Sequence, residues 1–146
     1  MIADDFILDP RLRADTHTVA ALSLCEVLLM DDARFPWLVL VPRRPGCAEV
    51  ADLPEADQAR LWREVATATT ALRTVAPCDK INLGALGNIV RQLHVHVVAR
   101  REGDDAWPGP VWGSGHARRR EKHEREDLLL RLRAALPGDA AGMAIG

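Results

Sequence analysis

The clearest alternation of hydrophobic and polar positions lies between residues 87 and 100, where two histidines stand among leucine and valine. Successive residues of a strand point to opposite faces, so this pattern predicts a β-strand with two unlike faces. One face is wholly apolar and suits a core: Leu93, Val95, Val97 and Ala99. The other face carries the polar groups: Val90, Gln92, His94, His96 and Val98. The strand separates packing from chemistry, and we expect it to carry the active site.

Three other short runs are rich in residues that favour strands. Residues 23–30 and 37–42 are apolar runs separated by Asp31-Asp32-Ala33-Arg34, and together they predict a hairpin. Residues 81–83 predict a further short strand, followed by a glycine-flanked loop over residues 84–88. Residues 6–8 end in an Asp-Pro turn signal and residues 12–18 show no clear period, so this first part is predicted to be loop and turn.

The spacing of apolar residues predicts two helices. Within residues 53–75 the apolar positions recur every three or four residues, and a proline stands near the start of this segment. Residues 102–113 are rich in proline and glycine and are predicted to be irregular. A second helix is predicted over residues 117–136 with an apolar stripe of Leu128, Leu129, Leu132 and Leu136. Residues 137–146 are predicted to be a flexible tail.

Length and charge narrow the class of protein. A chain of 146 residues that is 48% hydrophobic predicts one domain over residues 1–146, with a core of about residues 6–113. The net charge of −2 disfavours binding through many nonspecific phosphate contacts, so nucleic acid is not an expected partner. The run Arg118-Arg119-Arg120 is followed by several acids and is predicted to be a solvated helix face.

The cysteines and the first residues indicate the compartment. Cys25, Cys47 and Cys78 are odd in number and form no Cys-x-x-Cys pair, which disfavours a disulfide framework or a thiolate zinc site. The first six residues carry acids where a signal peptide would carry basic residues, and no run is long enough to cross a membrane. We therefore expect a cytoplasmic protein that does not contact the membrane.

Three uses fit a pair of histidines on one strand face. They can bind a metal, but His17, His116 and His123 show no spacing that would supply the missing ligands, and we expect no metal or other cofactor. They can be solvated or core-satisfied polar residues. They can also supply a nucleophile, which needs an unprotonated imidazole, a partner that orients it and nearby donors. Suitable donors are Gln92, His96, Asn82 and Asn88.

The segment Gly87-Asn88-x-Val90-x-Gln92-Leu93-His94-Val95-His96-Val97-Val98 resembles the signature of the histidine triad (HIT) family. Residues 38–43 resemble the family's second conserved strand, residues 53–74 its long helix, and residues 81–84 its asparagine-containing strand. Trp107-Pro108-Gly109 resembles the C-terminal segment of its nucleoside phosphoramidase branch. The resemblance covers roughly residues 24–110.

The resemblance implies an α+β fold with a mainly antiparallel sheet of about five strands, one long helix and a C-terminal helix. It also implies a homodimer that hydrolyses or transfers nucleotides at the α-phosphate, with a dinucleoside polyphosphate or a nucleoside phosphoramidate as substrate. Such a reaction passes through a covalent nucleotidyl-histidine intermediate that water resolves. A non-catalytic nucleotide-binding or partner-binding module of the same fold is the alternative, and a histidine-based metal protein is a more distant one.

The resemblance also assigns roles to residues. His94 matches the nucleophile, and His96 matches the last triad histidine, which contacts the phosphate oxygens and the leaving group. Asn82 and Asn88 match polar residues near the phosphates, and Asp31 or Asp32 matches the residue that holds the ribose.

Two positions depart from the family pattern. Gln92 stands where the first triad histidine is found, and it can orient His94 by hydrogen bonding but cannot carry a proton as imidazole does. Trp37 stands where a histidine often precedes the second conserved strand. Among the other tryptophans, Trp62 is predicted to pack or cover surface, whereas Trp107 and Trp112 can each pack across a dimer or line the nucleotide pocket.

Overall fold

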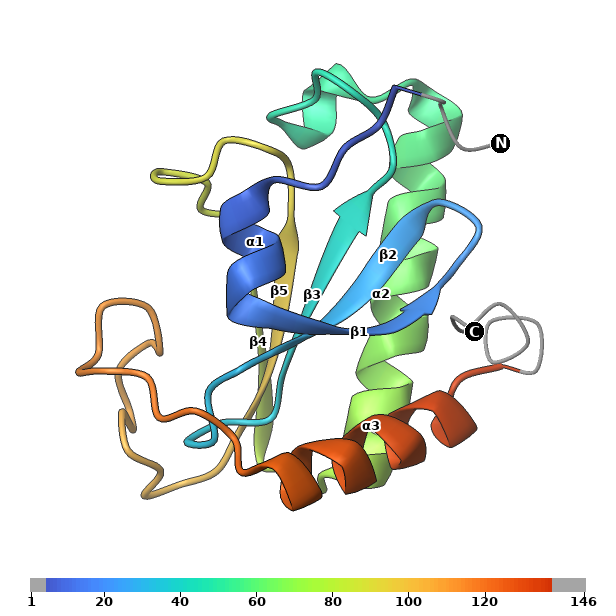
Figure 1. Ribbon diagram of the computed structural model, residues 1–146. Coiled ribbons are helices and arrows are strands. Elements are labelled where there is room, and N and C mark those ends of the chain that lie inside the picture. Colours follow the sequence, from blue (N-terminus) through green and yellow to red (C-terminus); the bar gives the residue numbers. More distant parts are fainter. Residues whose placement is uncertain (1–4, 138–146) are drawn as a thin grey trace.

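The computed structural model describes residues 5–137 of the chain, and within them a five-stranded antiparallel sheet has the order β1-β2-β3-β5-β4 (Figure 1). The strands are β1 Thr16–Ala21, β2 Cys25–Met30, β3 Trp37–Pro42, β4 Lys80–Gly84 and β5 Val95–Arg100. The helices are α1 Pro10–Asp15, α2 Glu55–Val75 and α3 Lys122–Ala135, with a 3-10 turn η1 at Val50–Asp52. The predicted α+β class with a long helix and a C-terminal helix is confirmed. No helix among the described residues is long and apolar enough to cross a membrane.

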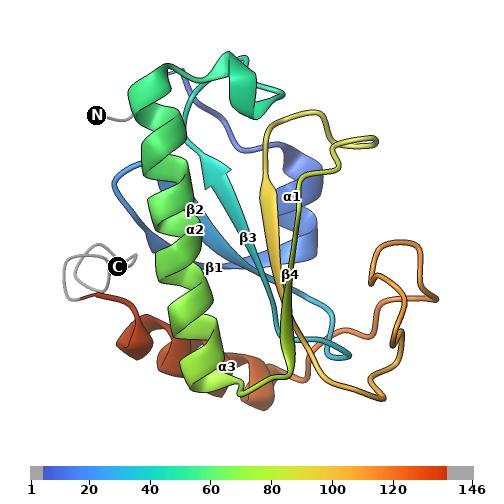
Figure 2. The ribbon, with the colours of Figure 1, turned by 180° about the vertical axis from the view of Figure 1, so that it is seen from behind.

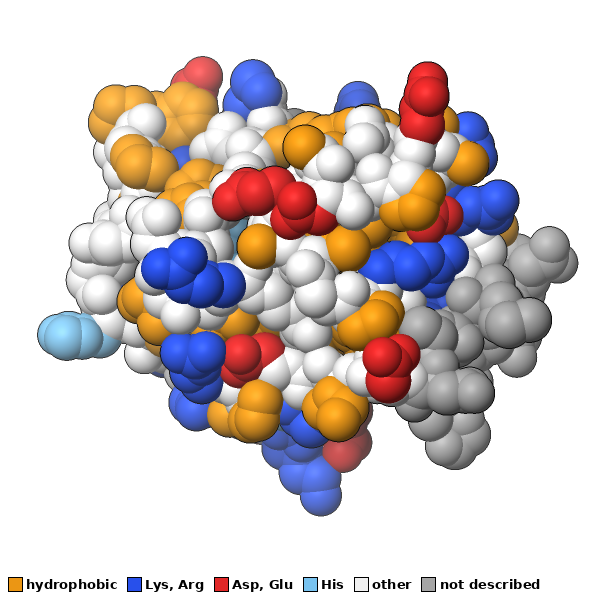
Figure 3. Space-filling model, turned by 90° about the horizontal axis from the view of Figure 1, so that it is seen from above, with side chains coloured by type: hydrophobic (Ala, Val, Ile, Leu, Met, Phe, Trp, Pro, Cys, Tyr) orange, Lys and Arg blue, Asp and Glu red, His pale blue; other side chains and the backbone are white. Residues whose placement is uncertain are grey.

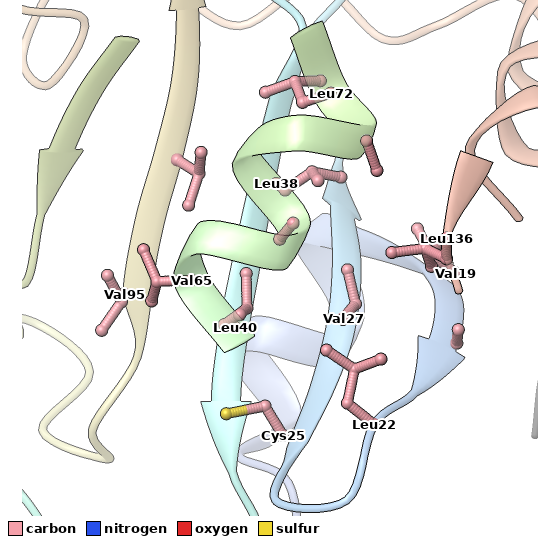
Figure 4. Close-up of a cluster of buried hydrophobic side chains, with 14 of the residues drawn as sticks. Val19, Leu22, Cys25, Val27, Leu38, Leu40, Val65, Leu72, Val95 and Leu136 are labelled. Atoms are coloured by element: carbon pink, nitrogen blue, oxygen red, sulfur yellow. The ribbon is translucent and has the colours of Figure 1, made fainter. Parts of the chain in front are cut away.

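The two faces of the sheet are covered differently. Helix α2 runs along one face, and α3 packs against α2 and β1 (Figure 2). Helix α1 lies on the opposite face, where Leu12 joins a second, smaller cluster (Figure 1). The main core fills the space between α2 and the sheet with side chains such as Leu38, Leu40, Val65 and Leu72 (Figure 4). The site described below lies on the same face as α1, away from α2.

Helix α2 follows its sequence pattern closely. The predicted stripe is buried along the whole helix: Leu61, Val65, Ala68, Leu72 and Val75. Glu64 lies on the same buried side, and its carboxylate accepts hydrogen bonds from the backbone N–H groups of Leu24 and Cys25. A buried carboxylate is tolerated when such donors satisfy it, so Glu64 ties α2 to the turn between β1 and β2.

The predicted apolar face of the histidine strand packs as expected. Val95, Val97 and Ala99 of β5, together with Leu93 just before it, belong to the main core. In the sheet, His96 lies opposite Val39 of β3 on one side and opposite Gly84 of β4 on the other. The prediction of one long strand is wrong in its extent, because β5 begins only at Val95. Gln92 precedes the strand, and its side chain bonds to the N-terminal segment instead of a neighbouring strand.

The prediction of loop and turn for the first part of the chain is confirmed for residues 6–9 and wrong for residues 10–18. The Asp-Pro pair starts α1, because the Asp9 carboxylate accepts the N–H of Arg11 and Pro10 occupies the first turn. Helix α1 and strand β1 have six residues each, too few for a period to be visible. An irregularity in the pairing between Thr18 and Ala20 further breaks the alternation of β1.

The C-terminal helix begins later than predicted. Helix α3 starts at Lys122, and residues 117–121 have no regular structure, because the N–H groups of Arg118 and Arg120 bond to the side chains of Asp32 and Asp31. The arginine run is therefore not a solvated helix face. Arg120 is the most enclosed of the three, and its guanidinium donates to the carbonyls of Met30 and Phe35. The predicted tail lies outside the described residues except for Pro137.

Candidate active site

A cavity of about 900 Å³ opens on the face of the sheet that carries His94 and His96. Its walls come from six separate parts of the chain: α1, the end of β2 with the following turn, Trp37 at the start of β3, the loop at residues 86–90, the two histidines at the start of β5, and residues 111–119. Both histidines line it although each is only 6% exposed. The alternative of solvated histidines is therefore excluded by their burial.

His94 is held by a backbone carbonyl. Its Nδ1 lies 2.7 Å from the carbonyl oxygen of Gln92, which can only accept a hydrogen bond. Nδ1 therefore carries the proton, and the lone pair of a neutral ring is on Nε2. A histidine in this tautomer has its nucleophilic nitrogen free while the other nitrogen fixes the orientation of the ring.

His96 is held in the opposite tautomer. The indole Nε1–H of Trp37 donates to His96 Nδ1 at 3.0 Å, and because indole is a donor only, Nδ1 must be unprotonated. Burial and the neighbouring His94 ring lower the pKa of His96 to about 3. The ring is thus neutral at pH 7, with its proton on Nε2. The two histidines offer a lone pair and an N–H donor, with ring centroids 4.9 Å apart.

Aromatic rings enclose His96. The ring centroid of Trp112 lies 5.4 Å from that of His96 and 6.3 Å from that of Trp37, both in edge-to-face geometry. Trp112 also lines the cavity, and its Nε1 has no hydrogen-bond partner within residues 5–137. Its ring passes close over Gly84, where a Cβ atom would lie 2.8 Å from Trp112 Cη2. Of the two roles left open for Trp112, lining the pocket is the one that this geometry favours.

Gln92 does not orient His94 through its side chain. The Gln92 amide donates to the carbonyl of Ile7 and accepts from the N–H of Asp9, both at 2.8 Å, and Gln92 is not among the cavity-lining residues. These bonds fasten the segment before α1 to the segment before β5. The backbone of Gln92, whose carbonyl accepts from His94, is thereby fixed in place.

Asp31 and Asp32 both line the cavity and are buried. Asp31 accepts from the N–H of Arg120 and the guanidinium of Arg119, and His17 Nε2 lies 3.2 Å from its Oδ2. Burial acts to raise the pKa of Asp31, but these hydrogen bonds outweigh it and lower the pKa to about 2. The carboxylate of Asp31 is therefore anionic at neutral pH.

Asp32 pairs with its neighbour Arg34 at 2.8 Å. Burial again opposes ionisation, while the hydrogen bonds from Arg34 and from the Arg118 N–H lower the pKa of Asp32. Arg34 lines the cavity as well and donates to the carbonyl of Ser114, so the turn after β2 holds the segment that carries Trp112. The spacing Asp32-x-Arg34 in this turn is the feature of the sequence from which the ion pair could have been predicted.

The two asparagines are placed differently. Asn88 is exposed and lines the cavity, as its predicted role requires. Asn82 lies outside the cavity lining, and its Oδ1 accepts from the guanidinium of Arg100 at 2.8 Å. Arg100 is fully buried, pairs with Asp104 and lies over the ring of Trp107. Asn82 and Trp107 thus belong to a structural cluster beside the cavity.

The surface around the site is mixed in charge. Seen from above, the molecule likewise shows acidic and basic side chains interspersed with hydrophobic ones (Figure 3). At the cavity itself, Arg11 and Arg119 have partly exposed guanidinium groups. Within residues 5–137, no group of three or more histidine, cysteine or acidic side chains is arranged to hold a metal ion.

Comparison with known proteins identifies the family to which this arrangement of residues belongs. The model of the HIT domain family matches residues 11–103. The chain belongs to the HIT family. This confirms the resemblance seen in the sequence and gives the fold its name, the HIT-like fold. Members of the family are generally nucleotide hydrolases and transferases.

Solved structures of other HIT proteins have nearly the same fold. A histidine triad protein from Sinorhizobium meliloti is 48% identical with a TM-score of 0.88, and the match covers 90% of this chain and 98% of that one. One from Bradyrhizobium japonicum is 45% identical, with the same TM-score and coverage. One from Marinobacter aquaeolei is 40% identical with a TM-score of 0.88, covering 95% of this chain and 98% of that one. Among curated proteins, none matches the chain.

Proposed function

We propose that this HIT protein is a nucleotide hydrolase that acts at the α-phosphate through a covalent nucleotidyl-His94 intermediate. The observation that carries the proposal is the tautomer of His94. Its Nδ1–H is held by the Gln92 carbonyl, so the lone pair on Nε2 is available on the wall of a cavity. A dinucleoside polyphosphate or a nucleoside phosphoramidate is the proposed substrate.

The proposed reaction has two displacements. The Nε2 lone pair of His94 attacks the α-phosphorus, an N–P bond forms, and the bond to the leaving group breaks with its electron pair on that group. Water then attacks the same phosphorus, the N–P bond breaks, the electron pair returns to Nε2, and the proton of water passes to solvent. Splitting one displacement in this way replaces one difficult step by two easier ones.

The neighbouring groups would stabilise the charge that develops on phosphorus. His96 offers a neutral Nε2–H beside His94, and a donor that burial holds fixed lowers the barrier without reorganisation. Asn88 is placed to bind phosphate oxygens, and Arg119, with a side chain that is 67% exposed, would attract an anionic ligand to the cavity. We propose that the ribose binds at the end of the cavity formed by Asp31 and Asp32.

For Gln92 we propose a positioning role instead of proton transfer. The resemblance implies that it takes the place of the first triad histidine, yet its amide is engaged by Ile7 and Asp9. Its contribution would be to hold rigid the carbonyl that orients His94. For Asn82, which bonds to Arg100, we propose support of the cavity wall in place of the phosphate contact implied by the resemblance.

The engagement of Gln92 also favours a second candidate function. A HIT fold without a third proton-carrying group at this position can bind nucleotides without turning them over. Such a binding module would show nucleotide affinity by calorimetry and no hydrolysis. The hydrolase and the binding module are therefore both expected to bind nucleotides, and only the hydrolase is expected to turn them over.

The test compares the parent protein with two variants. Hydrolysis of diadenosine tetraphosphate and adenosine 5′-phosphoramidate is measured for the parent, for His94→Ala, and for His123→Ala as a matched control, because His123 is exposed and outside the cavity lining. We expect the parent and the control to turn over at least one substrate and His94→Ala to lose activity by roughly 10⁴-fold or more, as is typical when a nucleophile is removed. Equal rates for the parent and His94→Ala would refute the proposal.

We also propose that the protein forms a homodimer in the cytoplasm and is a single domain. Within residues 5–137, strand β4 is an edge strand that pairs with β5 alone, and Leu83 on it is 50% exposed, which makes this edge a site for pairing with a second copy. The three cysteines are free, which agrees with a reducing compartment.

A further inference from the structure

The hydrogen bond between Trp37 and His96 bears on which leaving group the site can release. Trp37 comes from β3 and His96 from β5, and the indole Nε1–H donates to Nδ1 inside the second core cluster, where Trp37 is 7% exposed. Trp112 packs against both rings. Contacts with the rings of Phe35, His96 and Trp112 thus hold the indole with its N–H on His96.

Protonation of His96 at Nδ1 would set two N–H donors against each other at 3.0 Å. Either the buried indole N–H would lose its acceptor, or the ring would have to leave its place between Trp37 and Trp112. Leaving a buried donor unsatisfied is costly. Burial lowers the pKa of His96, and the titratable side chain that faces it, His94, acts in the same direction.

We propose, on the basis of the function proposed above, that Trp37 locks His96 as a neutral Nε2–H donor and that the site therefore favours leaving groups that depart as oxyanions over amines. A nucleoside phosphate leaves with the electron pair of the broken P–O bond as a stable anion. An amine leaving group needs a proton on nitrogen as the P–N bond breaks. A neutral imidazole that gave up its Nε2 proton would become an imidazolate, so His96 can donate a hydrogen bond but not that proton.

Among the described residues that line the cavity, no other side chain replaces this acid. The charged side chains that line it within the described residues are arginines and aspartates: Arg11, Arg34, Arg119, Asp15, Asp31 and Asp32. The pKa of Asp31 is about 2 and that of Asp32 is lowered, so the carboxylates of Asp31 and Asp32 hold no proton at neutral pH. His94 itself is occupied as the nucleophile. Polyphosphate substrates, with an oxyanion leaving group, thus fit the site better than phosphoramidates.

The first measurement is the tautomer of His96, read from the ¹⁵N shifts of both ring nitrogens between pH 5 and 8 in the protein without ligand. We expect Nε2–H and an unprotonated Nδ1 over the whole range. Trp37→Phe keeps an aromatic ring but removes the donor, and it should allow His96 to bind a second proton toward the acid end. Trp112→Phe is the matched control, because it changes a ring beside His96 without touching the hydrogen bond, and should leave the tautomer unchanged. Trp37→His, which restores a ring N–H, should return it toward the parent state.

The second measurement is kcat/KM for diadenosine tetraphosphate and adenosine 5′-phosphoramidate. General acid catalysis is worth roughly 10²–10⁴-fold, so we expect the parent to prefer the polyphosphate by about tenfold or more. In Trp37→Phe the preference should shrink, most at acidic pH, where a protonated His96 can supply the missing proton.

These outcomes separate the inference from the proposed function. A parent that cleaves the phosphoramidate more efficiently, or a His96 that titrates near neutral pH in the parent, would overturn the inference and leave the nucleotidyl-His94 mechanism standing. A shift in tautomer without any change in substrate preference would overturn the specificity role of Trp37. Failure of the proposed function would instead appear as no turnover of either substrate by the parent, and this would overturn the substrate preference as well.

Discussion

Replacing Gly84 by alanine should push Trp112 off its place over His96. An ideal Cβ at this position lies 2.8 Å from Cη2 and 3.1 Å from Cζ2 of the Trp112 ring, whereas carbon atoms in contact lie about 3.5–4.0 Å apart. The ring would have to move by roughly 1 Å, and it is packed against His96 and Trp37. Overpacking of this kind costs about 1–3 kcal/mol of unfolding free energy.

For a domain of this size the cost corresponds to a fall in Tm of roughly 3–12 °C. Urea unfolding gives the free energy, and near-ultraviolet circular dichroism reports the packing of the tryptophan rings. The control is a double-mutant cycle with Trp112→Leu, in which the clash with the ring is removed and Gly84→Ala should cost much less, with Leu86 Cδ1 at 3.3 Å as the remaining close neighbour. A cost below about 0.5 kcal/mol in the parent, or an equal cost in both backgrounds, would refute the reasoning.

Two further predictions concern acid stability and assembly. Because the pKa of Asp31 is about 2 in the folded protein against an ordinary 3.8, its contribution is complete above about pH 5 and is lost as pH falls toward 2. Acid unfolding should therefore be less steep in Asp31→Asn, and an unchanged acid transition would contradict this. Leu83→Glu at the edge of β4 should convert a dimer to a monomer in light scattering, and a dimer that persists would move the interface elsewhere.

The elements that could be predicted are those whose burial repeats along the chain. Helix α2 buries one stripe over 21 residues, so the three-and-four spacing is repeated often enough to identify it. Strand β5 buries Val95, Val97 and Ala99 in the main core, and alternation alone was enough to find that face. Helix α1 was missed because its six residues make less than two turns, so no spacing is repeated. Strand β1 was missed because its six residues contain a single, irregular alternation.

The start of the C-terminal helix was predicted wrongly for a tertiary reason. Arg118 and Arg120 have good helix propensity, but their N–H groups bond to Asp32 and Asp31, about 90 residues earlier in the chain. No local pattern contains that information. The turn after β2 and the segment before α3 hold each other in place, and together they form one end of the cavity.

The candidate site was predicted in part. The motif identified His94 and His96, and both line the cavity. The groups that set their tautomers could not be read from residue types alone. One is the backbone carbonyl of Gln92, and the other is the indole of Trp37, 59 residues away from His96 in the sequence. Gln92 was expected to act through its amide, but the contacts of that amide are with Ile7 and Asp9.

The most direct test of the account is the mass of the protein during turnover. The protein is mixed briefly with diadenosine tetraphosphate, denatured at mildly basic pH because N–P bonds are labile in acid, and measured intact before peptide mapping. The account predicts an added adenylyl group on the peptide that contains His94, present in the parent and absent from His94→Ala. Hydrolysis without any such adduct, or an adduct at another residue, would contradict the central claim that His94 is the nucleophile.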